Sequence, residues 1–80
     1  MPGTDITVKE LGERIAFHLR EARERKGLSQ KALAKRCRMA RKTVANYEGG
    51  RRTSFEGLVL LVRAAGALGI EVGDLISPRP

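Results

Sequence analysis

Helix start and stop signals divide this chain into short segments, and that division constrains its fold more than any other feature. Thr7 and Glu10 are spaced as a capping box, in which each residue satisfies an unpaired amide of the other. Beyond them, apolar residues recur at three- and four-residue steps, which is typical of a helix with one buried side. Gly27 suits the left-handed conformation that ends a helix. The first helix is therefore expected between Thr7 and Gly27.

Further segments follow the same rules, at residues 30–37, 41–48 and 55–65, with a last short turn at 72–76. Serine or threonine can cap the second and fourth helices, and glycine can end the third and fourth. The residues concerned are Ser29 before the second helix, Gly49-Gly50 after the third, Thr53 or Ser54 before the fourth, and Gly66 and Gly69 around its end. Because no window of four to eight residues alternates like a half-buried strand, the sequence predicts an all-α fold.

Eighty residues leave room for one domain. Cys37 has no second cysteine with which to form a disulfide, and a lone cysteine fits a reducing, cytoplasmic setting. With His18 as the only histidine, zinc would lack its usual ligands. The longest apolar run, Leu58 to Val62, is far shorter than the ~18 residues that suggest a membrane span, and residues 1–7 show no signal peptide. The sequence predicts one cytoplasmic domain over residues 1–80, with no metal, cofactor or membrane partner and with flexible ends at 1–6 and 77–80.

The distribution of charge indicates a partner. Sixteen Lys and Arg against nine Asp and Glu give a net charge of +7. Residues 20–52 contain twelve of the basic side chains and only three acidic ones, so this stretch carries +9 and the remainder −2. A merely soluble surface is the alternative, but ordinary surfaces interleave the two signs. A concentrated basic segment inside a structured domain is typical of proteins that bind a polyanion, most often nucleic acid.

The spacing of apolar residues between positions 30 and 47 indicates how that partner is bound. Apolar side chains fall four apart on the second helix and three apart on the third, so both helices can close on one core. A methionine fills the turn, and an alanine lies where the helices approach closely. These residues are Leu33, Cys37, Val44, Tyr47, Met39 and Ala34. The pattern predicts a helix-turn-helix over residues 30–48, whose second helix turns Arg41, Lys42, Ala45 and Asn46 toward the DNA major groove.

Six short motifs occur in a particular order, namely Leu19-Arg20 to Arg23, Gly27-Leu28-Ser29-Gln30, Leu33-Ala34, Thr43-Val44, Glu48-x-Gly50-Arg51-Arg52 and Ala67-Leu68-Gly69-Ile70. In this order and spacing the sequence resembles the XRE-type helix-turn-helix proteins, typified by phage repressors and Cro, over residues 8–76. The resemblance implies a compact five-helix, lambda-repressor-like domain. It also implies that the domain binds operator DNA, usually as a dimer, and represses or otherwise regulates transcription.

The sequence departs from the family pattern at four places. Arg38 stands where the family favours glycine, which predicts a left-handed non-glycine residue at a cost of about 1 kcal/mol. Ala40 replaces the usual Ser or Thr cap of the recognition helix, a loss of roughly 1 kcal/mol. The proline common after the Gly-Arg-Arg loop is missing. The stretch from Ser54 to Ala67 is about three residues longer than is usual in the family, so the fourth helix is expected to gain a turn.

Three side chains of the third helix are candidates for reading bases. Arg41 can donate two parallel hydrogen bonds to guanine O6 and N7, and Asn46 can pair with adenine N6 and N7. Lys42 can reach guanine or phosphate. The alternative for all three is a solvated helix face.

Five further residues are candidates for contacts with phosphate. Gln30 begins the second helix, where its amide and the unpaired backbone N–H groups can hold a phosphate. The other four are Ser29, Thr43, Arg51 and Arg52. For the arginines the alternative is generic solubility.

The resemblance also places Arg23 and Glu48 at positions that pair in this family. A partly buried bidentate pair would tie the first helix to the end of the recognition helix. An exposed, unpaired Glu48 is the alternative. Among the other titratable and aromatic residues, Cys37 and Tyr47 are expected in the core, and His18 on the surface.

The fourth helix contains more apolar residues than one inward face needs. Leu58, Leu61, Val62 and Ala65 would suffice for that face, which leaves Val59 and Leu60 outside it. We expect a two-fold homodimer that buries the surplus, with an interface formed by Val59, Leu60, Ile70, Val72, Leu75 and Ile76. The alternative is a longer helix that completes its own core.

Two function classes remain open. The first is a sequence-specific double-stranded DNA-binding regulator, most simply a repressor, that reads a palindromic operator. The second is an antitoxin-type interaction protein, which binds a toxin through its C-terminal helices and uses DNA for autoregulation. An enzyme is not expected, because the sequence offers no nucleophile with a base, no carboxylate pair and no phosphate-binding glycine loop.

Overall fold

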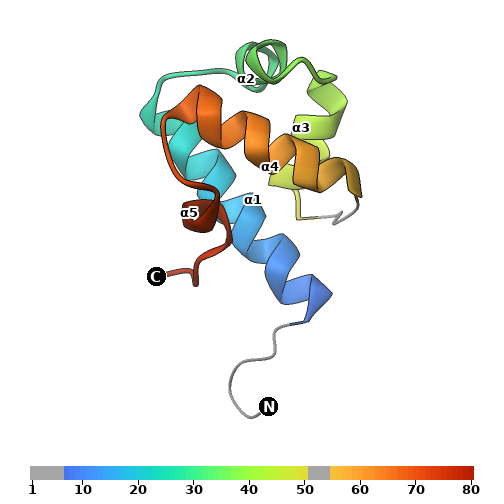
Figure 1. Ribbon diagram of the computed structural model, residues 1–80, viewed down its shortest axis with the longest axis vertical. Helices are drawn as coiled ribbons and strands as arrows, with labels where there is room; N and C mark the ends of the chain where they lie inside the picture. Colours follow the sequence, from blue (N-terminus) through green and yellow to red (C-terminus); the bar gives the residue numbers. More distant parts are fainter. Residues whose placement is uncertain (1–6, 51–54) are drawn as a thin grey trace.

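The computed structural model describes residues 7–50 and 55–80, and within these ranges the chain is helical with no strand. The helices are α1 (Val8–Arg25), α2 (Gln30–Cys37), α3 (Arg41–Glu48), α4 (Phe55–Leu68) and α5 (Val72–Ile76). Figure 1 shows α2 and α3 together at one end of the molecule, with α4 passing in front of α1 and α5 beneath it. The predicted all-α, five-helix fold is confirmed.

Side-chain caps start the first two helices where the sequence predicts them. Thr7 Oγ1 accepts a hydrogen bond from the Glu10 amide at 2.9 Å, and Ser29 Oγ accepts one from the Ala32 amide at 3.0 Å. The Glu10 carboxylate, however, lies 3.4 Å from Arg14 Nε, so it pairs along the helix instead of completing the expected capping box. The predicted caps Thr53 and Ser54 lie outside the described residues.

The end of α4 differs from the prediction. The helix continues through Gly66 to Leu68, and it stops at Gly69, whose φ of +70° is the left-handed conformation of a helix cap. The Ile70 amide donates to the Ala65 carbonyl at 3.0 Å and closes this cap. Leu68 is buried. The apolar contact of Leu68 with the core offsets the low helix propensity of Gly66, which sequence propensity alone cannot show.

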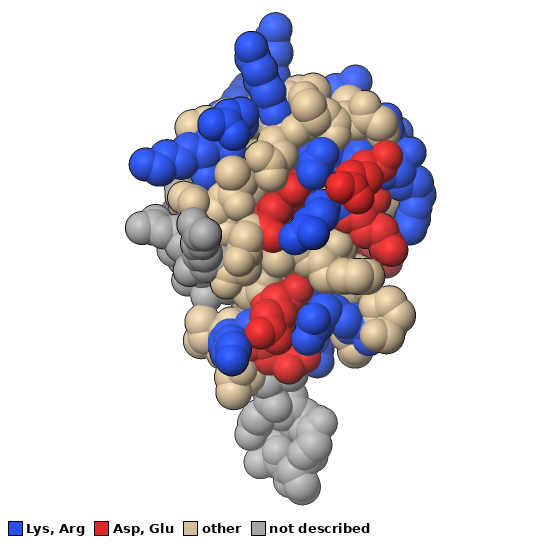
Figure 2. Space-filling view, turned by 180° about the vertical axis from the view of Figure 1, so that it is seen from behind, with Lys and Arg blue, Asp and Glu red and all other residues tan. Residues whose placement is uncertain are grey.

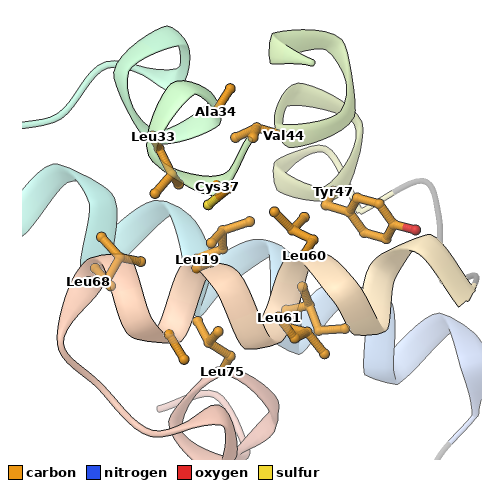
Figure 3. Close-up of a cluster of buried hydrophobic side chains, with 14 residues drawn as sticks. Leu19, Leu33, Ala34, Cys37, Val44, Tyr47, Leu60, Leu61, Leu68 and Leu75 are labelled. Atoms are coloured by element: carbon orange, nitrogen blue, oxygen red, sulfur yellow. The ribbon is translucent and has the colours of Figure 1, made fainter. Parts of the chain in front are cut away.

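One core joins all five helices. Figure 3 shows its central side chains converging between α1, α2, α3 and α4, with α5 closing one side. They are Leu19, Leu33, Ala34, Cys37, Val44, Tyr47, Leu60, Leu61, Leu68 and Leu75. Cys37 and Tyr47 are buried, as predicted, and Met39 packs against the same cluster from the turn.

The predicted inner face of α4 is confirmed at Leu61 and Ala65, which are buried, but it is wrong at Leu58 and Val62, so the helix is rotated relative to the prediction. Leu58 and Val62 are 59% and 64% exposed, whereas Leu60 is fully buried. A Cβ atom at Gly57 would lie 2.9 Å from the Tyr47 ring, so α4 turns this glycine toward α3. The inner stripe is therefore formed by Gly57, Leu60, Leu61, Ala64, Ala65 and Leu68. Apolar residues lie on both sides of α4, so their periodicity could not determine the rotation.

This rotation also corrects the expected dimer surface. Leu60 of α4 and Leu75 of α5 are both fully buried in the protein's own core, so neither is available to a second copy. Val72 and Ile76 each keep 37% exposure. Val59 is half-buried, and Ile70 packs partly against the core. The surplus apolar surface of α4 is on its Leu58 and Val62 side instead.

The chain after α5 lies against α1. His18 Nε2 is 2.9 Å from the Ser77 carbonyl oxygen and 3.2 Å from Ser77 Oγ, so His18 is half-buried and contacts the tail, and is not the surface residue that was expected. Arg79 Nη2 lies 3.2 Å from Glu13 Oε1, and Arg14 Nη1 donates to the Ile76 carbonyl at 3.3 Å. Residues 77–80, expected as a flexible end, thus make several contacts with α1. Residues 1–6 lie outside the described ranges.

Candidate nucleic-acid interface

The turn between α2 and α3 contains a left-handed arginine. Arg38 has φ of 56° and ψ of 44°, as the resemblance to the family predicts. Its amide donates to the Lys35 carbonyl at 3.2 Å, and the Met39 amide donates to the Ala34 carbonyl at 3.0 Å. These bonds complete the end of α2, but a side chain in this conformation costs about 1 kcal/mol relative to glycine.

The start of α3 has no side-chain cap. Ala40 is extended, with φ of −70° and ψ of 143°, and its methyl group cannot accept a hydrogen bond. Its carbonyl accepts from the amides of Thr43 and Val44 at 3.0 and 3.4 Å, so the helix begins where predicted. The missing cap forfeits roughly 1 kcal/mol of helix stability.

The buried side of α3 determines which residues face outward. Val44 and Tyr47 are almost fully buried against the core. Arg41 and Lys42 are exposed, and Asn46 is half-buried one helical turn beyond Lys42. Within the described ranges, none of these three side chains takes part in a hydrogen bond or an ion pair. Their polar groups are therefore available to a ligand.

The other end of α3 is held by a buried ion pair. Arg23 Nε lies 2.6 Å from Glu48 Oε2, and Arg23 Nη2 lies 2.9 Å from Glu48 Oε1. Glu48 is only 3% exposed. Arg23 Nη1 also donates to the Leu28 carbonyl at 2.7 Å, so one guanidinium joins α1, the loop before α2 and the end of α3. Hydrogen bonding to the Glu48 carboxylate raises the pKa of Arg23 above its ordinary value.

Two further side chains reach Glu48, and the sequence showed no sign of either contact. Gln30 Nε2 donates to Glu48 Oε1 at 3.1 Å, and Arg20 Nη2 donates to the Glu48 carbonyl at 3.3 Å. Both contacts join residues 18 or more positions apart, so no local pattern could have shown them. The contact with Glu48 fixes the orientation of the Gln30 amide at the start of α2.

Two of the remaining candidates for phosphate contact lie within the described residues, on or beside α2 and α3. Ser29 is exposed at the start of α2, where its oxygen caps the helix, and Thr43 is half-buried on α3. Arg51 and Arg52 lie outside the described residues. Figure 2 shows basic side chains gathered over the end formed by α2 and α3, whereas acidic side chains lie over the middle and lower part of the view, interspersed with basic ones.

The described residues offer few groups for other chemistry. No group of three or more His, Cys, Asp and Glu residues that could hold a metal occurs among them. Burial raises the pKa of the Cys37 thiol, which keeps it in its unreactive protonated form. No helix in the described part of the chain is both long and apolar enough to cross a bilayer.

Comparisons with known proteins agree with this geometry. A family model described as a helix-turn-helix domain matches residues 10–75. A hypothetical transcription factor, NHTF, from Neisseria has a similar structure, with a TM-score of 0.79 and 29% identity, covering 98% of this chain and 87% of that one. The restriction-modification controller protein C.AhdI from Aeromonas hydrophila has a TM-score of 0.72 and 38% identity, covering 80% and 94%.

A third structure is the clp gene regulator ClgR from Corynebacterium glutamicum, with a TM-score of 0.72 and 31% identity, covering 81% of this chain and 67% of that one. No curated protein sequence matches. The three structures are described as a hypothetical transcription factor, a controller protein and a gene regulator. With the matched family spanning most of the sequence, this chain belongs to the helix-turn-helix domain family and has the fold of its DNA-binding transcription regulators.

Proposed function

We propose that this protein is an XRE-type, sequence-specific regulator that binds a palindromic operator in double-stranded DNA and has no catalytic activity. One observation carries the proposal. Arg41, Lys42 and Asn46 face outward from α3 without partners among the described residues. The end of the same helix is fixed by the ion pair between its Glu48 and Arg23 of α1. Polar side chains without protein partners, on a helix packed against the core, suit a ligand that supplies hydrogen-bonding edges, as the major groove does.

The base-reading roles follow from chemistry and position. Arg41, at the first position of α3, would donate two hydrogen bonds to guanine O6 and N7. Asn46, within the second turn of the helix, would pair with adenine N6 and N7. Lys42 would contact guanine or phosphate beside them. The small Ala45 between these residues lets the helix approach the floor of the groove.

The phosphate contacts would orient the protein on the duplex without reading sequence. The start of α2 has unpaired backbone N–H groups next to Ser29 and Gln30, which suit a phosphate oxygen. The contact of Gln30 with Glu48 orients its amide for this role. Thr43, Arg51 and Arg52 would add further contacts with phosphate.

We propose that two copies bind together, through an interface that differs from the predicted one. Leu58, Val59 and Val62 line a shallow apolar hollow on the outer side of α4. Val59 is kept from the predicted interface, whereas Leu58 and Val62 take the place of the buried Leu60 and Leu75. Val72, Ile76 and Ile70 would complete the interface. A two-fold axis through it would set the two α3 helices about 34 Å apart, in successive major grooves.

The simplest regulatory role is repression, in which a bound dimer blocks a promoter. C.AhdI is described as a controller of restriction-modification and ClgR as a regulator of the clp gene. A cytoplasmic location fits a protein that acts on a bacterial-type operator and has a single buried thiol.

Selection from a random duplex pool tests the proposed DNA recognition. We expect a two-fold symmetric sequence to be enriched, and its affinity to fall steeply with salt. Arg41→Ala should weaken binding to that sequence by ~1–3 kcal/mol and barely affect random DNA. Arg25→Ala is a matched control, because Arg25 is exposed at the end of α1 and pairs with Glu21. Equal losses on selected and random DNA would rule out base reading by Arg41.

Sedimentation velocity tests the dimer. The protein should sediment as a dimer at tens of micromolar, and Val62→Glu should shift it to a monomer, since this change puts a charge on the exposed apolar side of α4. A monomeric wild-type protein would contradict the dimer. It would also leave this surface open to a different protein, as the antitoxin alternative requires.

A further inference from the structure

A side chain of α4 reaches the helix-turn-helix turn from outside the motif. Arg63 is the only basic residue of α4. Its Nη1 donates to the Cys37 carbonyl at 3.2 Å and to the Arg38 carbonyl at 3.5 Å. These two carbonyls belong to the last residue of α2 and to the left-handed residue after it.

The contact supplies a hydrogen-bond donor to carbonyl groups at the end of α2. The last carbonyls of a helix lack partners within the helix, and they carry the negative end of its dipole. A cation that donates to them satisfies both requirements. Glycine could adopt the left-handed conformation of this turn without strain, but Arg38 cannot. The turn is therefore held in a disfavoured conformation by contacts around it, and Arg63 supplies two of them.

The start of the recognition helix depends on this turn. Only Met39 and Ala40 separate Arg38 from Arg41, and Ala40 provides no side-chain cap to fix the first residues of α3. The buried pair of Arg23 and Glu48 holds the opposite end of α3, far from Arg41 along the helix. Arg63 is thus placed to set the orientation of the first residues of α3, and with it the direction in which Arg41 and Lys42 point.

We propose that Arg63 is a positioning residue for DNA sequence recognition, which acts by holding the left-handed turn at Arg38. This inference rests on the proposed function. Arg63 affects the reading of bases through the backbone and does not itself contact DNA. Its loss should therefore reduce sequence preference without removing a phosphate contact.

Fluorescence anisotropy with the selected duplex and a shuffled duplex tests this, at a temperature where circular dichroism shows each variant to be folded. Arg63→Ala should weaken binding to the selected duplex about fivefold, the range expected for a lost hydrogen bond, and to the shuffled duplex less than twofold. The dependence of affinity on salt should stay unchanged, because no phosphate contact is lost. Adding Arg38→Gly to Arg63→Ala should restore the affinity to within about twofold of wild type, since glycine needs no support in this turn.

Arg36→Ala is the matched control. Arg36 and Arg63 both line a hollow between α2 and α4, and they have the same charge, but Arg36 makes no hydrogen bond to the turn carbonyls. An equal loss for Arg36→Ala and Arg63→Ala, a weaker dependence on salt for Arg63→Ala, or no rescue by Arg38→Gly would each overturn the inference.

Hydrogen exchange separates this inference from the proposed function. A wild-type protein that prefers no duplex would refute the proposed function, but exchange at the turn would still decide the role of Arg63. In Arg63→Ala, the amides of Arg38 and Met39 should exchange about fivefold faster, and the Leu19 amide should not change. Unchanged exchange at both turn amides would overturn the inference whatever the DNA result.

Discussion

The two ends of α3 use charge in opposite ways. At its start, Arg41 and Lys42 are exposed and unpaired among the described residues. At its end, Glu48 is almost fully buried and accepts hydrogen bonds from Arg23 and Gln30. A buried carboxylate keeps its charge only if donors replace water, whereas an exposed cation needs no partner until a ligand arrives. One short helix thus combines a structural end with an end available for binding.

Removing the buried charge should have the largest effect. Glu48→Ala leaves the guanidinium of Arg23 mostly buried without its partner, so we expect the free energy of unfolding to fall by ~3–5 kcal/mol in urea denaturation. The control is Glu21→Ala, which breaks an exposed pair with Arg25 on the surface of α1 and should cost less than ~0.5 kcal/mol. A similar loss of unfolding free energy in the two variants would show that burial does not make the pair of Arg23 and Glu48 contribute more to stability than the exposed pair.

Removing a group at the binding surface should affect DNA binding and not stability. Asn46→Ala should weaken binding to the selected duplex by ~1–3 kcal/mol, because an adenine edge would lose its bidentate partner. The free energy of unfolding should change by less than ~0.5 kcal/mol, as is usual for surface substitutions. A large loss of stability in urea denaturation would place Asn46 with the structural end of the helix instead.

Capping the start of α3 should make it more stable. Ala40→Ser introduces an oxygen that can accept from an unpaired amide in the first turn, and we expect a gain of about 1 kcal/mol. Thermal unfolding followed by circular dichroism measures this gain. Ala40→Val is the control, since it adds side-chain volume but no acceptor, and it should give no gain. Equal stability of the serine and valine variants would mean that the cap does not form.

Relaxing the turn should have the smallest effect. Arg38→Gly removes the strain of a left-handed side chain but increases the freedom of the unfolded chain, so we expect a net gain of about 0.5 kcal/mol. Arg36→Gly, inside the last turn of α2, should instead lose about 1 kcal/mol. If both changes destabilised the protein alike in urea denaturation, the left-handed strain at Arg38 would be negligible.

Local features of the sequence predicted much of the fold. The caps at Thr7 and Ser29 depend only on residues a few positions apart. The same holds for the outward position of Arg41 and Lys42, because the burial of Val44 fixes the rotation of an eight-residue helix. The left-handed Arg38 and the missing cap at Ala40 were predicted from the family resemblance, as departures from its pattern. Contacts with DNA itself stay a prediction.

Features that depend on distant residues could not be predicted in this way. The rotation of α4 is set by the close approach of Gly57 to Tyr47, and a glycine does not register in a pattern of apolar side chains. Gln30 reaches Glu48, and His18 reaches Ser77, only after the helices have packed. Each of these contacts joins elements that are separate in the sequence.

The sequence by itself determined where each described helix starts, which residues separate one helix from the next, and which side of α3 is polar. These properties arise from backbone conformation and helical spacing within a few residues. Only the tertiary structure decided which side of α4 is buried, which polar groups satisfy Glu48, and which arginine supports the turn before α3. These depend on shape and distance between elements, because packing selects one arrangement among several that the same local preferences allow.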